Sequence, residues 1–454
     1  MIEVFGENTL LQAMMDFEAA LAHAQAAVGM IPARAASAIG GVCKVELFDV
    51  AAIVAESGRA GSLAIPLVKK LTETVALFDA DAARYVHWGS TSQDVIDTAM
   101  VLVTRKALAL IESNLDALIA ALFELAEREG DTPLLAHTLM QPAQVVSFGF
   151  RLAAWIAPLV RARQRLRESA HEALQLQLGG PVGTLSAMGV NGAAVREQMA
   201  ERLQLRASQA SWHTQRDEWV RLGCQVGVLC GSLGKVARDL SLMAQGEIGE
   251  LAEPSGAGRG GSSAMPHKRN PVAAMVALAA ALRVPQRVAA LLAAMPQEHE
   301  RGLGNWQAEL AEWVGLFISA DGAVKALAEA AAGLHVDTLR MRENIERMQG
   351  LVHAEAVAMK LAATLGKARA HAIVQAWSQQ AIDERRHLRD IAVAALVDDP
   401  ALAGAATPDE MVRLFDPDTA ADAARREAHR QLEGLRAQWQ AGKSPRRGAD
   451  DTSR

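Results

Sequence analysis

Aromatic residues are scarce in this chain, at 4% of its 454 residues, and there is a single tyrosine. Half of the residues are nevertheless hydrophobic, and alanine and leucine dominate that half. Both residues favour helix over strand. We therefore predict an all-α fold, in a chain long enough for a large core and more than one folding unit.

Cysteines and an excess of positive charge are also lacking. The three cysteines, Cys43, Cys224 and Cys230, are odd in number and widely spaced, which argues against a disulfide framework. We expect a reducing, cytoplasmic compartment. The sequence has no CxxC, HExxH or Cys/His cluster, so we expect no metal site. A net charge of −6 argues against nonspecific nucleic-acid binding.

Long uninterrupted apolar runs are missing as well. The start, MIEVFGENTL, lacks a charged segment followed by an apolar one, so we expect no signal peptide. The most membrane-like run covers residues 271–296, and Arg283, Pro285 and Arg287 interrupt it. An arginine at the bilayer centre costs about 2.5–3.5 kcal/mol. We predict a helix that protein buries on most faces, and no membrane partner.

The apolar periodicity divides the chain into regions of short and long helices. Long helices are predicted over 95–130, 141–175, 213–250, 271–296 and 305–332, about twice the average helix length or more. Such alanine-rich helices can approach closely and form a bundle. We predict a domain of shorter helices over 1–94, a central bundle over 95–345, a helical domain over 346–440 and a disordered tail over 441–454. No alternating strand pattern is evident.

Two nucleotide-binding motifs are excluded. Residues 256–261 satisfy GxGxxG, but a dinucleotide fingerprint follows a strand, and here a helical segment precedes it. The phosphate-binding pattern GxxxxGK[ST] is absent.

Polar side chains instead gather at the ends of the predicted long helices. The clusters are HWGSTSQD at 87–94, TLMQP at 138–142, WHTQRD at 212–217 and HER at 299–301. A single hydroxyl in each of the first three is explained by helix capping. Capping leaves the accompanying histidine, amide and arginine groups unexplained, and helix N-termini flanked by hydroxyls bind anions. In a bundle these ends can converge, especially when several subunits contribute.

The loop GSSAMPHKRNP at 261–271 is the most informative segment. It follows a glycine-rich run and combines two hydroxyls, a lysine and an amide within ten positions. Glycines let a loop move and turn its N–H groups toward a ligand. A polar linker between two helices explains the glycines but not this combination, which is suited to closing over a small anion.

Together these clusters resemble the fumarase/aspartase superfamily, whose signature is GSSxMPxKxNP. The resemblance covers residues 5–440 and implies a three-part all-α fold with a central five-helix bundle. It further implies a homotetramer whose active sites each combine three subunits. Members form or break a C–O or C–N bond β to a carboxylate, without metal or cofactor.

Two departures select a branch of the superfamily. Adenylosuccinate lyases carry a catalytic histidine in T-H-x-Q-P, and this chain has Leu139 there. The supporting glutamate, four residues after the final loop proline, is Met275. The loss of the histidine accounts for the loss of the glutamate, because a buried carboxylate without its partner is costly. HWGSTSQDVIDT, WHTQRD, NWQAE and TPDEMVRLFDP at 407–417 are similar to the 3-carboxy-cis,cis-muconate cycloisomerase family.

That resemblance implies interconversion of an open tricarboxylate and a γ-lactone. Ser262 would be the acid/base, and Lys268 and Asn270 would stabilise an aci-carboxylate. Substrate contacts would come from His87, Thr91, Ser92, Gln93, Thr138, Gln141, Gln215, Ser263 and Arg301. His137 is either an ordinary histidine near a helix start or a shifted replacement for the lost one. Two alternatives stay open: another superfamily lyase such as adenylosuccinate lyase, and an inactive structural protein like some lens crystallins.

Overall fold

Helices carry nearly all of the regular structure. A computed structural model describes residues 1–256, 260–261 and 264–442. The α-helices of this part are α1 Glu7–Ala27, α2 Ala33–Val42, α3 Val50–Ala60, α4 Ala64–Phe78, α5 Ser92–Glu129, α6 Phe148–Ala173, α7 Gly192–Leu203, α8 Asp217–Met243, α9 Val272–Ala294, α10 Asn305–Ala332, α11 Thr338–Glu346, α12 Ala354–Leu365, α13 Lys367–Glu384, α14 Leu388–Asp398, α15 Pro408–Leu414 and α16 Pro417–Ala441. The predicted all-α class is therefore confirmed.

Within the described residues, the strands are short and form three two-stranded sheets. The strands are β1 Pro133–Thr138, β2 Gln141–Ser147, β3 Gln175–Leu176, β4 Arg206–Ala207, β5 Leu251–Ala252 and β6 His335–Val336. β1 pairs with β2 and β5 with β6 in antiparallel fashion, whereas β3 and β4 are parallel.

The chain divides into two compact units. Unit 1 comprises residues 1–115, 162–231 and 279–325, and unit 2 comprises 116–161, 232–278 and 326–454. Each of the five long helices, α5, α6, α8, α9 and α10, contributes residues to both units. The predicted domain boundaries at 94, 345 and 440 stay predictions.

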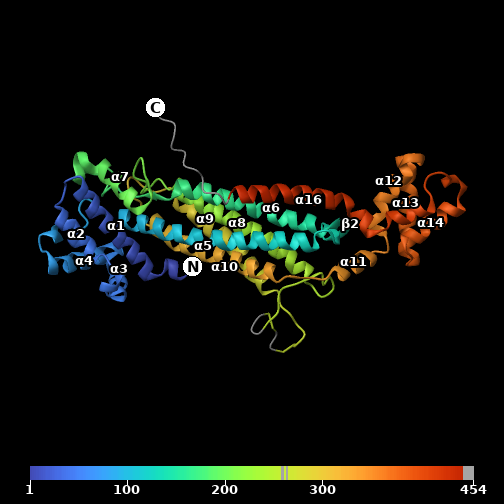
Figure 1. Ribbon diagram of the computed structural model, residues 1–454, viewed down its shortest axis with the longest axis horizontal. Helices are drawn as coiled ribbons and strands as arrows, with labels where there is room; N and C mark the ends of the chain where they lie inside the picture. Colours follow the sequence, from blue (N-terminus) through green and yellow to red (C-terminus); the bar gives the residue numbers. More distant parts are fainter. Residues whose placement is uncertain (257–259, 262–263, 443–454) are drawn as a thin grey trace. The chain divides into compact units, whose positions relative to one another are not determined.

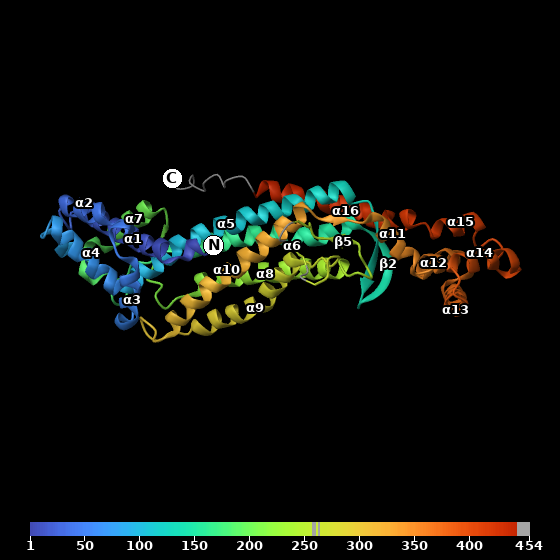
Figure 2. The ribbon, with the colours of Figure 1, turned by 90° about the horizontal axis from the view of Figure 1, so that it is seen from below.

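Unit 1 combines a group of shorter helices with segments of the long ones. α1 packs against α2 and α7, and α4 packs against α2 and α3 (Figure 1). The segments of α5, α8, α9 and α10 lie side by side (Figure 2). Trp219 of α8 stacks on Trp313 of α10 with ring centroids 3.9 Å apart, and Trp313 Nε1 donates to Thr104 Oγ1 of α5 at 2.9 Å. A Cβ on Gly227 of α8 would lie 2.7 Å from Val288 of α9, so only glycine permits this close helix contact.

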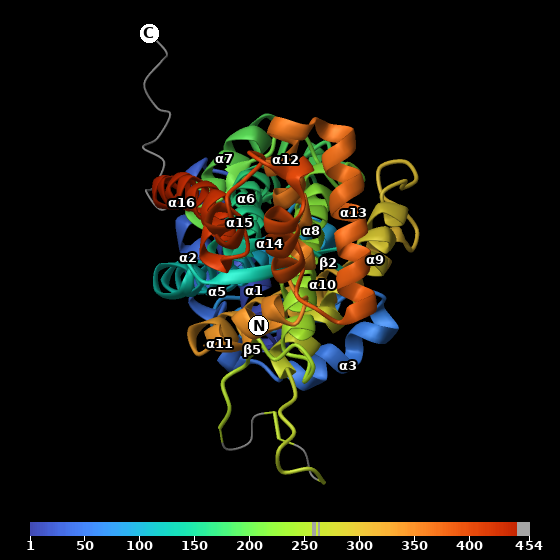
Figure 3. The same cartoon turned by 90° about the vertical axis from the view of Figure 1, so that its right-hand side faces the viewer.

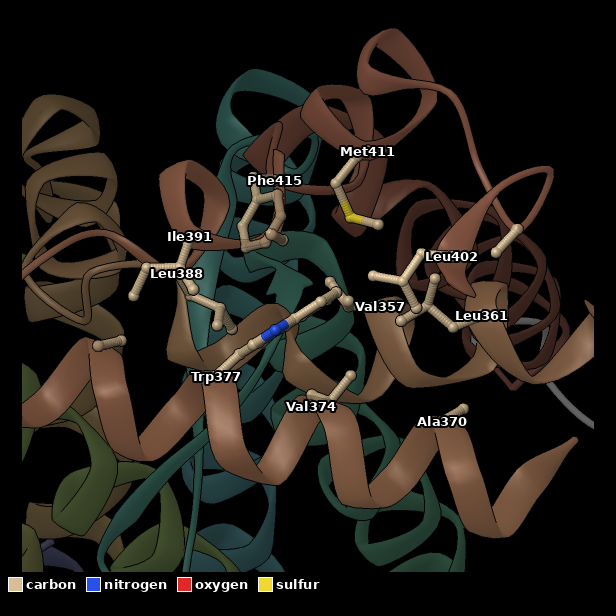
Figure 4. Packing of buried hydrophobic residues seen from close by; sticks show 13 residues of the cluster. Val357, Leu361, Ala370, Val374, Trp377, Leu388, Ile391, Leu402, Met411 and Phe415 are labelled. Carbon is tan, nitrogen blue, oxygen red and sulfur yellow. The ribbon is translucent and has the colours of Figure 1, made fainter. Parts of the chain in front are cut away.

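Unit 2 has its own core in the C-terminal helices. α12, α13, α14 and α15 group together (Figure 3), and α12 and α13 pack along each other. Val357, Trp377, Leu388 and Phe415 point into a shared apolar cluster between them (Figure 4). α16 contacts β2, and its Trp439 donates to Asp116 Oδ1 at 2.6 Å.

The prediction of a helix starting at residue 141 is wrong. Residues 133–147 form the β1–β2 hairpin, and α6 begins only at Phe148. Leu139 and Met140 make the two-residue turn, with φ of 50° and 66°. Two positive φ values are the geometry that matches the right-handed twist of paired strands. The hairpin packs on α11 and α16, so tertiary contacts favour strand pairing over local helix propensity.

The prediction that protein buries α9 on most faces is not met within one chain. By its length and composition, α9 is apolar enough to cross a membrane, as core helices of soluble proteins also are. Only 22% of its most apolar stretch is buried. Met275, Leu282 and Leu292 are exposed by 60%, 69% and 49%. The other long predicted helices agree with α5, α8 and α10, although α8 begins and ends several residues inside the predicted 213–250.

Candidate active site

The structure distributes the predicted site residues over both units. Unit 1 contains His87, Thr91, Ser92, Gln93, Gln215 and Arg301, and unit 2 contains Thr138, Gln141, Lys268 and Asn270. Ser262 and Ser263 lie outside the described residues.

Arg301 is brought onto the start of α5 in unit 1. Its NH1 donates to Thr91 Oγ1 at 2.9 Å, and its Nε donates to Gln93 Oε1 at 3.3 Å. The preceding loop is tied to the WHTQRD segment, because Thr214 Oγ1 donates to the carbonyl of His299 at 3.2 Å. The Arg301 side chain remains exposed. Three of the predicted substrate-binding residues thus form one contiguous cationic and polar cluster.

Asp94, in the first turn of α5, fixes the backbone beside that cluster. Asp94 accepts from the N–H of Thr91 at 3.1 Å and from Gly179 N and Gly180 N at 2.9 and 2.8 Å. His213 Nε2 lies 2.8 Å from the same carboxylate. The Asp94 side chain is fully buried, so these contacts supply the partners that a buried carboxylate requires.

A second buried acid, Asp97, holds the Gln93 amide. Gln93 is 2% exposed, and its Nε2 donates to Asp97 Oδ2 at 3.2 Å and to the carbonyl of His213 at 3.0 Å. Asp97 in turn accepts two hydrogen bonds from Arg216, at 2.9 and 3.2 Å. Arg216 also reaches Glu309 of α10 at 2.5 Å. All three charged side chains of this group are 1% exposed.

His87 forms a buried pair with Glu18 of α1. His87 Nδ1 lies 2.6 Å from Glu18 Oε1, whose side chain is fully buried. Burial disfavours the charged imidazole, but the charge and hydrogen bond of Glu18, together with Asp94, raise the pKa of His87 above its ordinary value. The residue sits in the left-handed region, with φ of 60°, which is uncommon outside glycine. The pair therefore favours a cationic imidazole in unit 1.

Two predicted residues in unit 1 make no such contacts. Gln215 is exposed, and its side chain has no hydrogen bond within the described ranges. Ser92 is half-buried and begins α5. Their roles as substrate contacts stay predictions.

In unit 2, Thr138 and Gln141 flank the exposed hairpin turn. They pair across the hairpin, and Leu139 and Met140 between them are 97% and 71% exposed. Thr138 therefore caps no helix. Partial burial and the positive charge of Arg151 lower the pKa of nearby His137, which favours its neutral form.

Lys268 and Asn270 lie between β5 and α9, directly before the start of α9. The Asn270 N–H donates to the carbonyl of Gly260 at 2.8 Å, which closes the base of the loop. Gly260 has φ of 67°, and a Cβ there would lie 2.9 Å from the Asn270 carbonyl oxygen. The Lys268 side chain is exposed and the Asn270 side chain half-buried. Glycine at 260 thus lets the two ends of the loop, at Gly260 and Asn270, come together.

Comparison with known proteins defines the class. Residues 1–285 match the family model described as lyase, and residues 350–433 match that of the adenylosuccinate lyase C-terminus. The chain belongs to this lyase family, within the fumarase/aspartase superfamily that the loop signature predicted.

Within the family, the chain is similar to one group of enzymes over nearly its whole length. It is 46% identical to 3-carboxy-cis,cis-muconate cycloisomerase of Bradyrhizobium diazoefficiens, over 90% of either chain. It is 47% identical to the enzyme of that name from Pseudomonas aeruginosa, over 91% of this chain and 89% of the relative. The crystal structure of 3-carboxy-cis,cis-muconate lactonizing enzyme from Pseudomonas putida matches with a TM-score of 0.90 at 42% identity, covering 97% of both chains.

Sequence reasoning missed the buried half of the site. It placed Gln215 among the substrate contacts but not its neighbour Arg216 of the same WHTQRD cluster, and it assigned no role to Asp97 or Glu309. One signal was present: Asp94 and Asp97 are one turn apart at the start of a long, largely apolar helix, where a buried acid requires partners. The partners Arg216 and Trp306 of Asp97 lie 119 and 209 positions away in sequence, beyond the reach of any local pattern.

Proposed function

We propose that this protein interconverts 3-carboxy-cis,cis-muconate and a carboxymuconolactone. The observation that carries the proposal is the placement of Arg301 by Thr91 and Gln93, which presents a guanidinium to a substrate carboxylate. Guanidinium binds carboxylates bidentately. Near-full-length similarity to cycloisomerases makes a tricarboxylate the substrate that fits best.

In the lactonising direction a carboxylate oxygen adds to a carbon–carbon double bond. The C–O bond forms as the π electrons move toward the neighbouring carboxylate, which becomes an aci-carboxylate, and the α-carbon then takes up a proton. Lys268, Asn270 and the loop N–H groups are suited to hold this extra negative charge. Ser262 is assigned as the acid/base and Ser263 as an orienting residue.

Apolar residues replace the acid/base pair of other superfamily lyases. Leu139 and Met275 stand at the two positions, and both side chains are exposed in one chain. A carboxylate is a weak base and leaves without protonation, so the reverse reaction needs no histidine–glutamate pair. The replacement of this pair by Leu139 and Met275 therefore supports a cycloisomerase over a nitrogen-eliminating lyase.

We further propose a cytoplasmic homotetramer whose active sites combine residues of several subunits, with no metal or cofactor. The exposed apolar residues of α9 support assembly, because patches of this kind mark protein interfaces.

Incubation with 3-carboxy-cis,cis-muconate tests the activity. We expect diene absorbance to fall as the lactone forms. Ser262→Ala and Lys268→Ala should reduce the rate by about a hundredfold or more, since each removes a group that acts in the transition state. Sedimentation should show the same oligomer for both variants. Near-normal turnover by Ser262→Ala would refute its assigned role.

Adenylosuccinate lyase is the second candidate, favoured by the match of residues 350–433 to that family's C-terminal model. A parallel assay with adenylosuccinate separates the two. Cleavage of adenylosuccinate, with no change in carboxymuconate, would overturn the cycloisomerase proposal.

A further inference from the structure

A buried chain of hydrogen bonds links Arg301 to the interior of unit 1. It runs from Arg301 through Gln93 and Asp97 to Arg216 and Glu309. Only Arg301 is exposed, so the other four side chains cannot meet a substrate directly. Because they lie behind an exposed guanidinium, these four side chains are placed to orient Arg301.

The orientation of the Gln93 amide is the critical point. An amide has one accepting and one donating end, and a carboxylate only accepts. Asp97 therefore requires that the NH2 group face inward, and the same group also donates to the His213 carbonyl. The amide oxygen must then face outward, where it accepts from Arg301 Nε. A flipped amide would set its oxygen against the Asp97 carboxylate and its donors against Arg301.

Arg216 and Trp306 hold the Asp97 carboxylate that imposes this orientation. Arg216 donates to both Asp97 oxygens, and the Trp306 indole donates to Asp97 Oδ1 at 2.9 Å. Burial opposes a charged guanidinium, yet Asp97 and Glu309 together raise the pKa of Arg216 further. One arginine between two carboxylates leaves the group with an excess negative charge, which attracts the cation of Arg301 from the solvent side.

We propose that Asp97 and Arg216 are positioning residues, which act through a fixed Gln93 amide to hold Arg301 over Thr91 for a substrate carboxylate. Gln93 then serves as a relay, because the contacts of both ends of its amide are already taken. This inference rests on the proposed function and replaces the predicted role of Gln93 as a direct substrate contact.

A double-mutant cycle tests the coupling. Asp97→Asn should raise KM for carboxymuconate about tenfold, the effect of losing a hydrogen bond to a charged group, and change kcat much less. In an Arg301→Ala background, Asp97→Asn should have almost no further effect on KM. Additive effects of the two substitutions would overturn the inference, since a merely structural role acts independently of Arg301.

Gln93→Met provides a second test of the inference, and Asp321→Asn provides its control. Gln93→Met leaves the Asp97–Arg216–Glu309 group in place and should reproduce the rise in KM, even if Asp97→Asn folds poorly. Asp321→Asn is the matched control: it also neutralises a buried acid of α10, about 18 Å along that helix from Glu309. It should leave KM unchanged. Wild-type KM in Gln93→Met would overturn the relay role.

Calorimetric binding of tricarballylate, a simple tricarboxylate, separates this inference from the proposed reaction. Non-additive weakening by Asp97→Asn and Arg301→Ala, in a protein that leaves carboxymuconate unchanged, supports the positioning role and refutes the proposed reaction. Normal turnover with additive substitutions refutes only the positioning role.

Discussion

At the scale of single residues, His87 and Glu18 form a titratable pair in unit 1. A protonated His87 gains the charge and hydrogen bond of a fully buried carboxylate 2.6 Å away. Because its folded-state pKa is raised, the pair contributes stability that is fully present below the ordinary histidine pKa of about 6.5. That contribution is lost as the pH rises through the higher pKa of the folded state.

Glu18→Gln should therefore lower the pKa of His87, since burial remains while the opposing charge is removed. The loss of unfolding free energy should be about 2 kcal/mol below pH 6, the value for a hydrogen bond to a charged group, and should shrink at higher pH. NMR titration of the imidazole and urea unfolding across pH measure the two effects. Asp16→Asn, an exposed acid of the same helix, is the control. An unchanged His87 titration would contradict the pairing.

At the scale of elements, the β1–β2 hairpin carries strain in its turn. Type I′ turns favour Asn-Gly, whereas Leu139 and Met140 occupy the left-handed region here. A non-glycine residue in a sparsely populated region costs about 1–3 kcal/mol. Such an exposed apolar turn is explained if the proposed oligomer uses it.

Replacing the turn by Leu139→Asn with Met140→Gly should stabilise the hairpin by about 1 kcal/mol or more and lower kcat/KM. Thermal unfolding and the diene assay measure the two. Gln204→Gly, at the left-handed end of α7 with φ of 53°, is the matched control and should stabilise without loss of activity. Unchanged kcat/KM in the turn variant would show that the apolar tip has no functional part.

Element by element, the sequence was informative where structure is local. Apolar periodicity predicted α5, α8, α9 and α10, because long amphipathic or apolar helices repeat over many turns. The hairpin was missed, since its turn has neither Asn nor Gly and β2 alternates poorly in burial. The polar clusters before α5, α8 and α10 were likewise recognised from neighbouring residues, whereas TLMQP at 138–142 lies in the hairpin and not at a helix start. The pairing of Asp97 with Arg216 and Glu309 depends on how distant helices pack, which no local pattern encodes.

At the scale of the whole molecule, α9 leaves apolar side chains exposed in a single chain. Apolar residues along this helix are exposed, yet Arg287 on the same helix pairs with Glu312 of α10 at 2.7 Å. Arginines within the span make a lipid environment costly. A second copy of the chain covers such residues without that cost, in agreement with the proposed tetramer.

Leu282→Glu places a charge among these exposed apolar side chains, where leucine is 69% exposed. Burying an unpaired carboxylate in an interface should weaken assembly by several kcal/mol, so we expect smaller species in sedimentation and loss of turnover at low protein concentration. Val397→Glu, at a 69% exposed position of α14, should leave both unchanged. If Leu282→Glu sediments and turns over like the unaltered protein, this part of α9 does not lie in an interface, and another surface must build the oligomer.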